Sequence, residues 1–217
     1  TAPEIGSVTL ASDNSTVDVS FTEIVYNSSG GSGALEASDF ALSITQNGGE
    51  AALQSATPSS ISYISSENVY RLGIDLDTMH TPTGVETLTV NAAGAASIYD
   101  AAGNAAVANQ SGTDNQITMN DQSGPTVTYV DSSTSSQLWG IGATINVKII
   151  FNETIVVTGT PQLTLTTDVA GSGTTAVNYN GTITSENSGT NNTMNFTYTV
   201  AEGDNSSDLD YASTSAL

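Results

Sequence analysis

Residues 16–21, Thr-Val-Asp-Val-Ser-Phe, are the stretch of sequence that decides the fold class. Apolar and polar side chains alternate along it, and successive side chains of a β-strand point to opposite faces of the sheet. Val17, Val19 and Phe21 therefore share one face, and the polar residues share the other. The pattern predicts a half-buried strand in a two-layer structure, and Glu86–Val90 repeats it.

More short strands are expected around this stretch, whereas long segments with apolar residues at helical spacing are absent. Gly, Asn, Ser and Pro fill the gaps between strands, and Asn47-Gly48-Gly49 is typical of a hairpin turn. Seven short strands at this spacing predict an all-β fold, a β-sandwich of immunoglobulin-like architecture. In the first half of the chain the expected strands are Ile5–Leu10, Thr16–Phe21, Phe40–Thr45, Ala51–Ser55, Val69–Ile74, Val85–Asn91 and Gln116–Met119.

The second half of the chain restarts the pattern of the first. Ala2-Pro3-Glu4-Ile5 is similar to Gly124-Pro125-Thr126-Val127, and Glu23 corresponds to Glu153. Such self-similarity is typical of repeated domains. The sequence therefore predicts two tandem immunoglobulin-like β-sandwiches joined by a short polar segment, residues 1–121 and residues 122–217.

The second sandwich is expected to lack its final strand. After the expected strand Thr193–Val200 and a loop over residues 201–211, nothing corresponds to Gln116–Met119. A sandwich without its last strand exposes a sheet edge and part of its core. Two interpretations fit: the chain is truncated, or a strand of another chain completes the sheet.

The charge balance argues against several classes of function. The 217 residues contain Lys+Arg 2 and Asp+Glu 22, which gives a formal net charge of −20. Arg71 and Lys148 cannot neutralise a run of phosphates, so nucleic-acid binding is not expected, and an anionic membrane surface would repel the chain. No apolar run approaches the roughly 18–20 residues of a membrane-spanning helix, so no membrane insertion is expected in this segment. With Cys 0, a sufficient core or a bound metal must stabilise the fold instead of disulfides.

Several segments resemble the immunoglobulin-like repeats of large bacterial surface proteins and adhesins. They are Val17–Tyr26, Gly33–Leu42, Ile98–Asn104, Val157–Leu165 and Ala201–Tyr211. The resemblance covers nearly the whole chain. It implies a tandem, cadherin-like array, often stiffened by calcium, and an extracellular location at the cell surface or after secretion. It does not imply a particular ligand, because this scaffold serves many surface proteins.

Strand order predicts where acidic residues meet. If consecutive strands alternate in direction, the loops after the second, fourth and sixth strands lie at the N-terminal pole of a domain. With Thr193–Val200 as the sixth strand, the loop that follows shares this pole with Glu153. The loop after the fifth strand and the linker bring acidic residues of the first domain to the same junction. The carboxylates expected there are Asp75, Asp77, Asp121, Glu153, Asp204, Asp208 and Asp210.

A cation is expected at this junction, because so many carboxylates in a small volume repel one another. Calcium takes six to eight oxygen ligands in flexible geometry, which suits carboxylates on loops. In Asp208-Leu-Asp210, a spacing of two residues on extended chain points both carboxylates the same way. The alternative is that these aspartates are solvated or form turns.

The N-terminal pole of the first domain repeats this logic with Glu23, Asp100 and Asn104. The segment Asp100-Ala-Ala-Gly-Asn104 either offers oxygens to a cation or closes a tight turn through side-chain hydrogen bonds. We expect the turn, because residues 1–217 contain no preceding domain to complete a cage.

The sequence offers few candidate catalytic residues, so we do not expect an enzyme. His80 is the only histidine and stands beside Thr81-Pro82, without a recognisable nucleophile and orienting group. Trp139 is the only tryptophan, either a core or strand-edge residue or a platform for a sugar ring.

The sequence therefore predicts a non-enzymatic structural or adhesion module, a calcium-rigidified spacer or stalk of a bacterial surface protein. Its partners would be neighbouring repeats or neighbouring subunits. Two alternatives remain open: a filament subunit completed by strand donation from a neighbouring chain, and a carbohydrate-binding module that takes a surface glycan.

Overall fold

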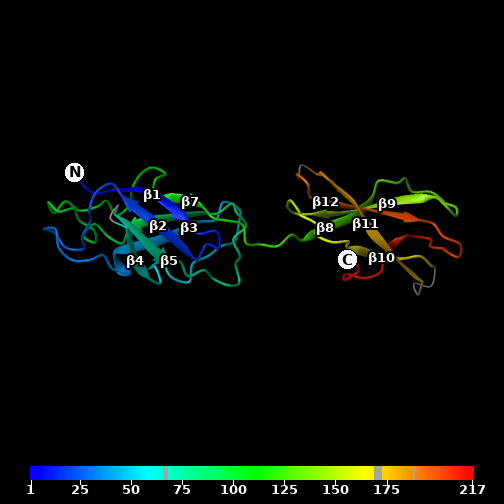
Figure 1. The fold of residues 1–217 in the computed structure, drawn as a ribbon, viewed down its shortest axis with the longest axis horizontal. Coiled ribbons are helices and arrows are strands. Elements are labelled where there is room, and N and C mark those ends of the chain that lie inside the picture. The colour runs from blue at the N-terminus through cyan, green and yellow to red at the C-terminus, as the bar shows by residue number, and fades with distance from the viewer. Residues whose placement is uncertain (66–67, 169–172, 188) are drawn as a thin grey trace. The chain divides into compact units, whose positions relative to one another are not determined.

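The computed structural model describes residues 1–65, 68–168, 173–187 and 189–217. In these residues the regular structure is almost entirely antiparallel β-sheet, and the only helix is a single 3-10 turn, η1 (Ala37–Asp39). The chain divides into two compact units, Thr1–Ser123 and Gly124–Leu217, called here the first and the second unit (Figure 1). The fold is therefore all-β, and no described helix is long and apolar enough to cross a membrane.

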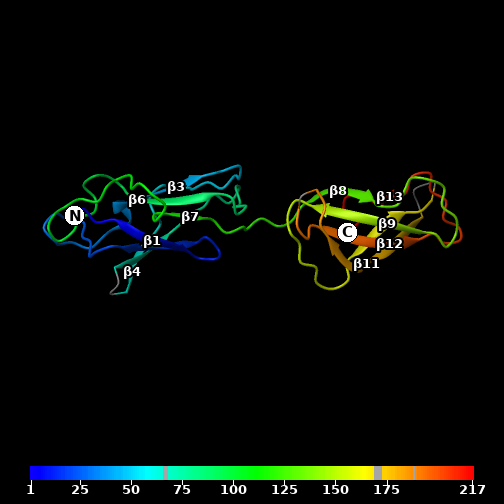
Figure 2. The ribbon, with the colours of Figure 1, turned by 90° about the horizontal axis from the view of Figure 1, so that it is seen from above.

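Two antiparallel sheets form the first unit and share one apolar core (Figure 2). One sheet has the strand order β1-β2-β5-β4 and the other β3-β6-β7. Val17 and Val19 of the first sheet and Leu88 and Val90 of the second are fully buried in this core. The strands are β1 (Ile5–Leu10), β2 (Thr16–Phe21), β3 (Phe40–Thr45), β4 (Ile61–Ser65), β5 (Val69–Gly73), β6 (Thr87–Ala92) and β7 (Gln116–Thr118).

Strand β2 shows why the sequence folds this way. Its apolar residues face the core, whereas Asp18 faces the other side of the sheet. There its two carboxylate oxygens accept hydrogen bonds of 2.7 and 2.8 Å from the guanidinium of Arg71 on β5. One face of the strand packs against the second sheet and the other meets solvent, which is what the alternation of residues 16–21 predicts.

The second unit is a single continuous sheet with the strand order β13-β10-β11-β12-β9-β8. Strand β11 pairs with β10 through Thr174–Asn178 and with β12 from Tyr179 onward, so it connects the two halves of the sheet. Leu163, Leu165 and Phe196 form the centre of its core. The strands are β8 (Val127–Ser132), β9 (Thr144–Phe151), β10 (Gln162–Thr166), β11 (Thr174–Thr184), β12 (Thr193–Thr199) and β13 (Asp210–Tyr211).

The two units repeat one strand order. The order β1-β2-β5-β4 of the first unit corresponds to β8-β9-β12-β11 of the second. In the first unit β6 pairs with β3, with Ile44 opposite Leu88, and in the second β13 pairs with β10, with Leu165 opposite Tyr211. Strand β13 therefore holds the position of the start of β6. Within the described part of the second unit, no strand corresponds to β7.

Two local expectations differ from the structure. Ala51–Ser55 is not a strand, because only Leu53 forms an isolated bridge there, to Leu76. The turn after β3 does form: Gly49 donates a backbone hydrogen bond of 2.7 Å to Gln46, and Asn47 has a positive φ of 50°. It does not close a hairpin, because the partner of β3 is β6 and not the next strand in sequence.

Candidate functional site

Three of the predicted metal ligands, Asp75, Asp77 and Asp121, belong to the first unit, Thr1–Ser123. Asp77 caps a turn: its Oδ1 accepts the Met79 N–H at 2.9 Å, and its Oδ2 lies 2.8 Å from Nδ1 of His80. Both contacts lower the pKa of Asp77, and the hydrogen bond from Met79 is the larger cause. Asp121 likewise accepts the Ser123 N–H at 2.9 Å, whereas Asp75 is exposed. Two of the three carboxylates therefore already serve turns.

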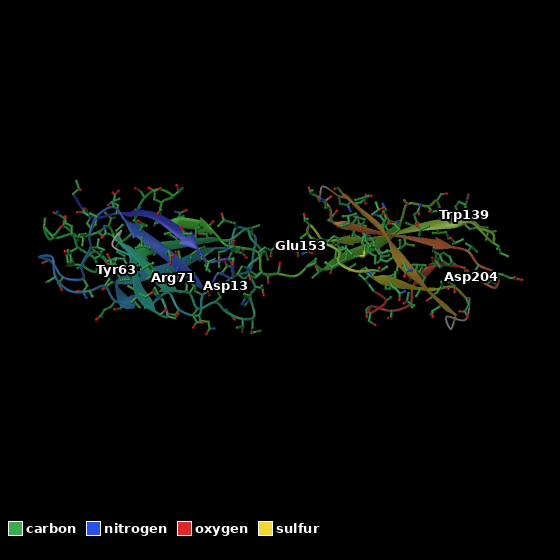
Figure 3. The ribbon with its side chains drawn as sticks, viewed as in Figure 1. Asp13, Tyr63, Arg71, Trp139, Glu153 and Asp204 are labelled. Carbon is green, nitrogen blue, oxygen red and sulfur yellow. The ribbon has the colours of Figure 1, made fainter. Side chains whose placement is uncertain are left out.

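The other four predicted ligands do not share one pole of the second unit. Glu153 follows the end of β9, whereas Thr144, at the start of β9, pairs with Thr199, at the end of β12 and shortly before Asp204. Eight residues of strand separate the two ends by about 23 Å at ~3.3 Å per residue. Figure 3 shows Glu153 at one end of the second unit and Asp204 at the other.

The cause of this error is a miscounted strand. Among the described strands of the second unit, β12 is the fifth and not the sixth. Because successive strands alternate in direction, a difference of one strand moves the following loop to the opposite pole. Asp204, Asp208 and Asp210 therefore lie at the pole away from Glu153, and the expected gathering with Glu153 is wrong.

Asp204 instead holds a buried tyrosine. Its carboxylate accepts hydrogen bonds from the hydroxyl of Tyr198 and, at 2.6 Å, from the backbone N–H of Ala201. The Tyr198 hydroxyl is the main cause that lowers the pKa of Asp204. Burial, and then the Asp204 carboxylate, raise the pKa of Tyr198. Asp210 accepts the N–H of Tyr211 at 2.8 Å, and Asp208 accepts the Ser206 hydroxyl through its backbone carbonyl at 2.7 Å.

At the other end of the first unit, Asp100 and Asn104 close the tight turn. Asp100 is buried, and its carboxylate accepts the backbone N–H of Asn104 at 2.7 Å and the side-chain amide of Asn104 at 2.6 Å. The Asn104 amide is the main cause that lowers the pKa of Asp100. Glu23 is half-buried in the segment after β2.

No group of three or more His, Cys, Asp or Glu side chains in the described residues is arranged to hold a metal ion. Calcium at the junction of the two units stays a prediction.

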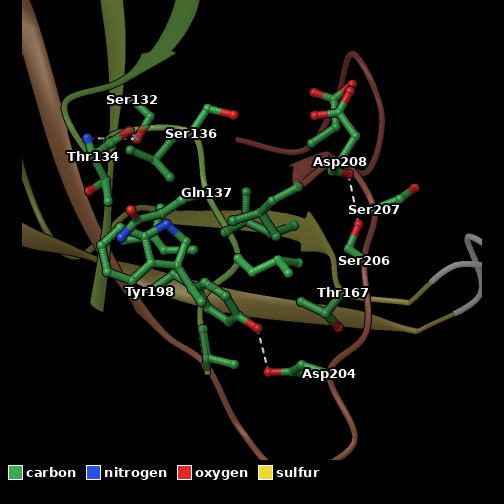
Figure 4. Close-up of a pocket in the computed structure, with 18 of the residues that line it drawn as sticks. Ser132, Thr134, Ser136, Gln137, Thr167, Tyr198, Asp204, Ser206, Ser207 and Asp208 are labelled. Atoms are coloured by element: carbon green, nitrogen blue, oxygen red, sulfur yellow. Dashed lines mark hydrogen bonds between the residues drawn. The ribbon is translucent and has the colours of Figure 1, made fainter. Parts of the chain in front are cut away.

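The second unit contains a cavity of about 510 Å³ at the pole of Asp204 (Figure 4). Residues of β8, β9, β10 and β12 line it, together with residues 204–211 and the loop that carries Trp139. Trp139 lines the cavity, and its indole N–H donates to the Ser135 carbonyl of the same loop at 3.2 Å. In the first unit the corresponding space, between β1 and β6, contains β7. The cavity therefore lies where the described residues of the second unit include no counterpart of β7.

Sequence reasoning missed a buried carboxylate at Glu86. Its side chain is fully buried and accepts backbone N–H groups from Glu50, Ala51, Thr83 and Val85 at 3.0–3.3 Å. Burial is the largest influence and raises the pKa of Glu86, but the N–H donors together outweigh it and hold the pKa below its ordinary value. The Thr83-Gly-Val-Glu86 spacing, typical of side-chain-to-backbone capping, is the signal that was available.

Sequence reasoning also missed two amide pairs that join the first and last segments of the first unit, residues 1–14 and 105–123. The Gln110 side chain accepts the N–H of Ile5 and donates to its carbonyl, both at 2.7 Å. The Asn14 side chain donates to the carbonyl of Asn120 at 2.8 Å and accepts its N–H at 2.9 Å. Each amide side chain thus pairs with a backbone as a residue of a neighbouring strand would. Local sequence patterns do not reveal such partners, because they are more than a hundred positions apart.

Comparison of the chain with protein-family models, with curated proteins and with solved structures finds no match.

Proposed function

We propose that the chain is a pair of immunoglobulin-like β-sandwich repeats from an extracellular bacterial surface protein. In this proposal it acts as a non-enzymatic spacer that spans a distance and withstands tension. The observation that supports it is the strand order shared by the two units, β1-β2-β5-β4 and β8-β9-β12-β11. Repetition of one unit along a chain is how extended arrays are built.

The path of the chain through the first unit also favours this role. The chain enters beside Ile5, at the start of β1, and leaves through Asn120, which contacts Asn14 beyond the end of β1. Tension applied through neighbouring repeats therefore runs along β1 from one end of the unit to the other. Calcium is the cofactor that we propose for such an array, since the chain has a net charge of −20.

Mechanical extension of single molecules tests the proposal. We expect the first unit to unfold in one step, because a load-bearing repeat resists until its core fails. The 123 residues of Thr1–Ser123 would release up to roughly 440 Å of chain at ~3.6 Å per residue, less the folded span. Smooth extension without this step would refute the spacer role.

A second function, a subunit that accepts a donated strand, is favoured by the cavity of about 510 Å³. Its occupant would carry the pattern of residues 115–120, in which the apolar Ile117 and Met119 alternate with polar residues. A peptide of residues 113–121 tests this role, with Trp139 fluorescence as the readout because this residue lines the cavity. A saturable change that is lost when Asp replaces Ile117 and Met119 supports strand donation, and no change refutes it.

A further inference from the structure

The first unit has a specific device at the two ends of β1. We propose that the Gln110–Ile5 and Asn14–Asn120 amide pairs are the mechanical clamp of this unit, the contacts that must break before it unfolds under tension. This inference rests on the proposed function, because only a repeat that bears load requires such a clamp.

The clamp matters because the terminal strands belong to different sheets. In the described residues β1 pairs only with β2, and β7 pairs only with β6. Strands β1 and β7 are in contact, but no backbone hydrogen bond joins residues 1–14 to residues 105–123 in this fully described part of the unit. The direct hydrogen-bonded links between the first and last segments of the unit are therefore made by side chains.

Amide side chains supply these links at both ends of β1. At its start, Gln110 binds the backbone of Ile5 through two hydrogen bonds. Beyond its end, Asn14 binds the backbone of Asn120 through two more. The Asn120 amide adds a bond of 2.9 Å to the Ala11 carbonyl, and the Gln122 amide adds one of 2.8 Å to the Ser12 carbonyl.

The arrangement loads these bonds together. Tension pulls the segment that begins at Ile5 in one direction and the segment that ends at Asn120 in the other. Both amide pairs then resist the same displacement, instead of opening one after another like the rungs of a hairpin. Asn14 is fully buried, so water does not compete for its hydrogen bonds.

The chemistry requires an amide at both positions. Each side chain donates to a carbonyl and accepts from an N–H of the same residue, and only an amide offers both groups in one plane. A carboxylate of the same shape keeps the acceptor but places a second oxygen against the carbonyl. Asn14→Asp and Gln110→Glu therefore remove the donor with almost no change in volume.

The test compares the unfolding rate of the full chain at constant tension among the wild type, Asn14→Asp, Gln110→Glu and the double variant. Asn47→Asp is the matched control: Asn47 also has a positive φ, and its amide donates two hydrogen bonds of 3.0 Å, to Val85 and Thr87, but it lies outside residues 1–14 and 105–123, the first and last segments of the unit. We expect each clamp variant to unfold about tenfold faster under tension, equivalent to about 1.4 kcal/mol of barrier, and Asn47→Asp to match the wild type.

Unfolding in urea without tension separates a clamp from ordinary stabilisation. A clamp residue must change the rate under tension more than the equilibrium change explains, whereas Asn47→Asp must not. Clamp variants that unfold like Asn47→Asp under tension would overturn the inference while leaving the wild-type step, and thus the spacer role, intact. If circular dichroism shows that Asn14→Asp fails to fold, Gln110→Glu, at a residue that is only partly buried, decides the result alone in the same way.

Discussion

The side chain of Asn14 binds both backbone hydrogen-bonding groups of Asn120, a residue 106 positions later in the chain. The contact depends on the turn between β1 and β2, in which Asn14 has a φ of 59° and its N–H donates to the Ala11 carbonyl at 2.9 Å. Asn tolerates this left-handed conformation better than most residues with a Cβ. One residue thus shapes a local turn and fixes the segment through which the chain leaves the unit.

Two substitutions at Asn14 separate these roles. Asn14→Gly keeps the positive φ and loses the amide, so we expect the free energy of unfolding to fall by about 1–3 kcal/mol, because two hydrogen bonds to the backbone of Asn120 are lost. Asn14→Ala loses the amide and adds backbone strain of about 1 kcal/mol or more. Urea titrations of the two variants check the order. Equal stability of the two variants would show that the turn is not strained.

The buried Glu86 predicts how acid destabilises the first unit. Its pKa is lower in the folded state than its ordinary value of 4.5, so its contribution to stability is complete above that value. The contribution is lost as the pH falls from about 4.5 through the lower folded pKa. Glu86→Gln should therefore destabilise the unit at pH 7, and its difference from the wild type should shrink on acidification. Urea titrations between pH 7 and pH 3 measure this difference, and a constant difference would contradict the assignment.

Gly49 should be irreplaceable because the Glu86 carboxylate occupies the space of its missing side chain. A Cβ at Gly49 would lie 2.1 Å from Oε1 of Glu86, which is far inside contact distance. We expect Gly49→Ala to lower the free energy of unfolding by about 1–3 kcal/mol, as overpacking does. Gly6→Ala is the control, since its Cβ meets no atom closer than 3.4 Å. Similar melting temperatures for the two variants would refute the prediction.

In the second unit, Asp204→Ala should destabilise the pole that contains the cavity. The substitution leaves the hydroxyl of the buried Tyr198 without this acceptor, at a cost of about 1–3 kcal/mol. Asp208→Ala is the control from the same loop, because the Ser206 hydroxyl donates to the backbone carbonyl of Asp208, which the variant retains. Trp139 is the only tryptophan, so its fluorescence reports unfolding of this unit alone. A loss as large in Asp208→Ala would contradict this role of Asp204.

Calcium removal tests the proposed cofactor. If calcium binds the folded chain, a free calcium concentration of about 100 times the dissociation constant adds about 2.7 kcal/mol per site to the free energy of unfolding. The melting temperature then rises. The measurement is thermal melting with excess calcium and again with a chelator. Asp75→Asn and Asp121→Asn should each reduce the shift, whereas Asp114→Asn, at an exposed residue before the start of β7 and so away from Asp121, should not. An identical melting temperature in both conditions would remove calcium from the account.

Local alternation predicted much of the fold. Strands β1, β2 and β3 lie where the sequence predicts them. One face of each packs against the core, so apolar residues recur at every second position of the sequence. Strand β4 was not predicted because it lies at the edge of its sheet. Tyr63 is 57% exposed there, so burial does not require apolar and polar residues to alternate along this strand.

The positions of the predicted site residues depended on a less local property. The Asp100–Asn104 turn follows from five consecutive residues and was expected as a turn. The pole of Asp204 depends on the number of strands before it, so one miscounted strand reversed its position. The Gln110 and Asn14 pairs join residues 105 and 106 positions apart, and only the folded chain brings them together.

Two pulling directions in the first unit test whether tension is resisted along β1. The chain has no cysteine, so pairs of cysteine handles can be introduced at will. Handles at Thr1 and Ser123 pull through both amide pairs, whereas handles at Thr1 and the exposed Ile24 peel β1 from β2 one hydrogen bond at a time. We expect a clearly higher unfolding force for the first pair than for the second. Equal forces, or a higher force between Thr1 and Ile24, would contradict it.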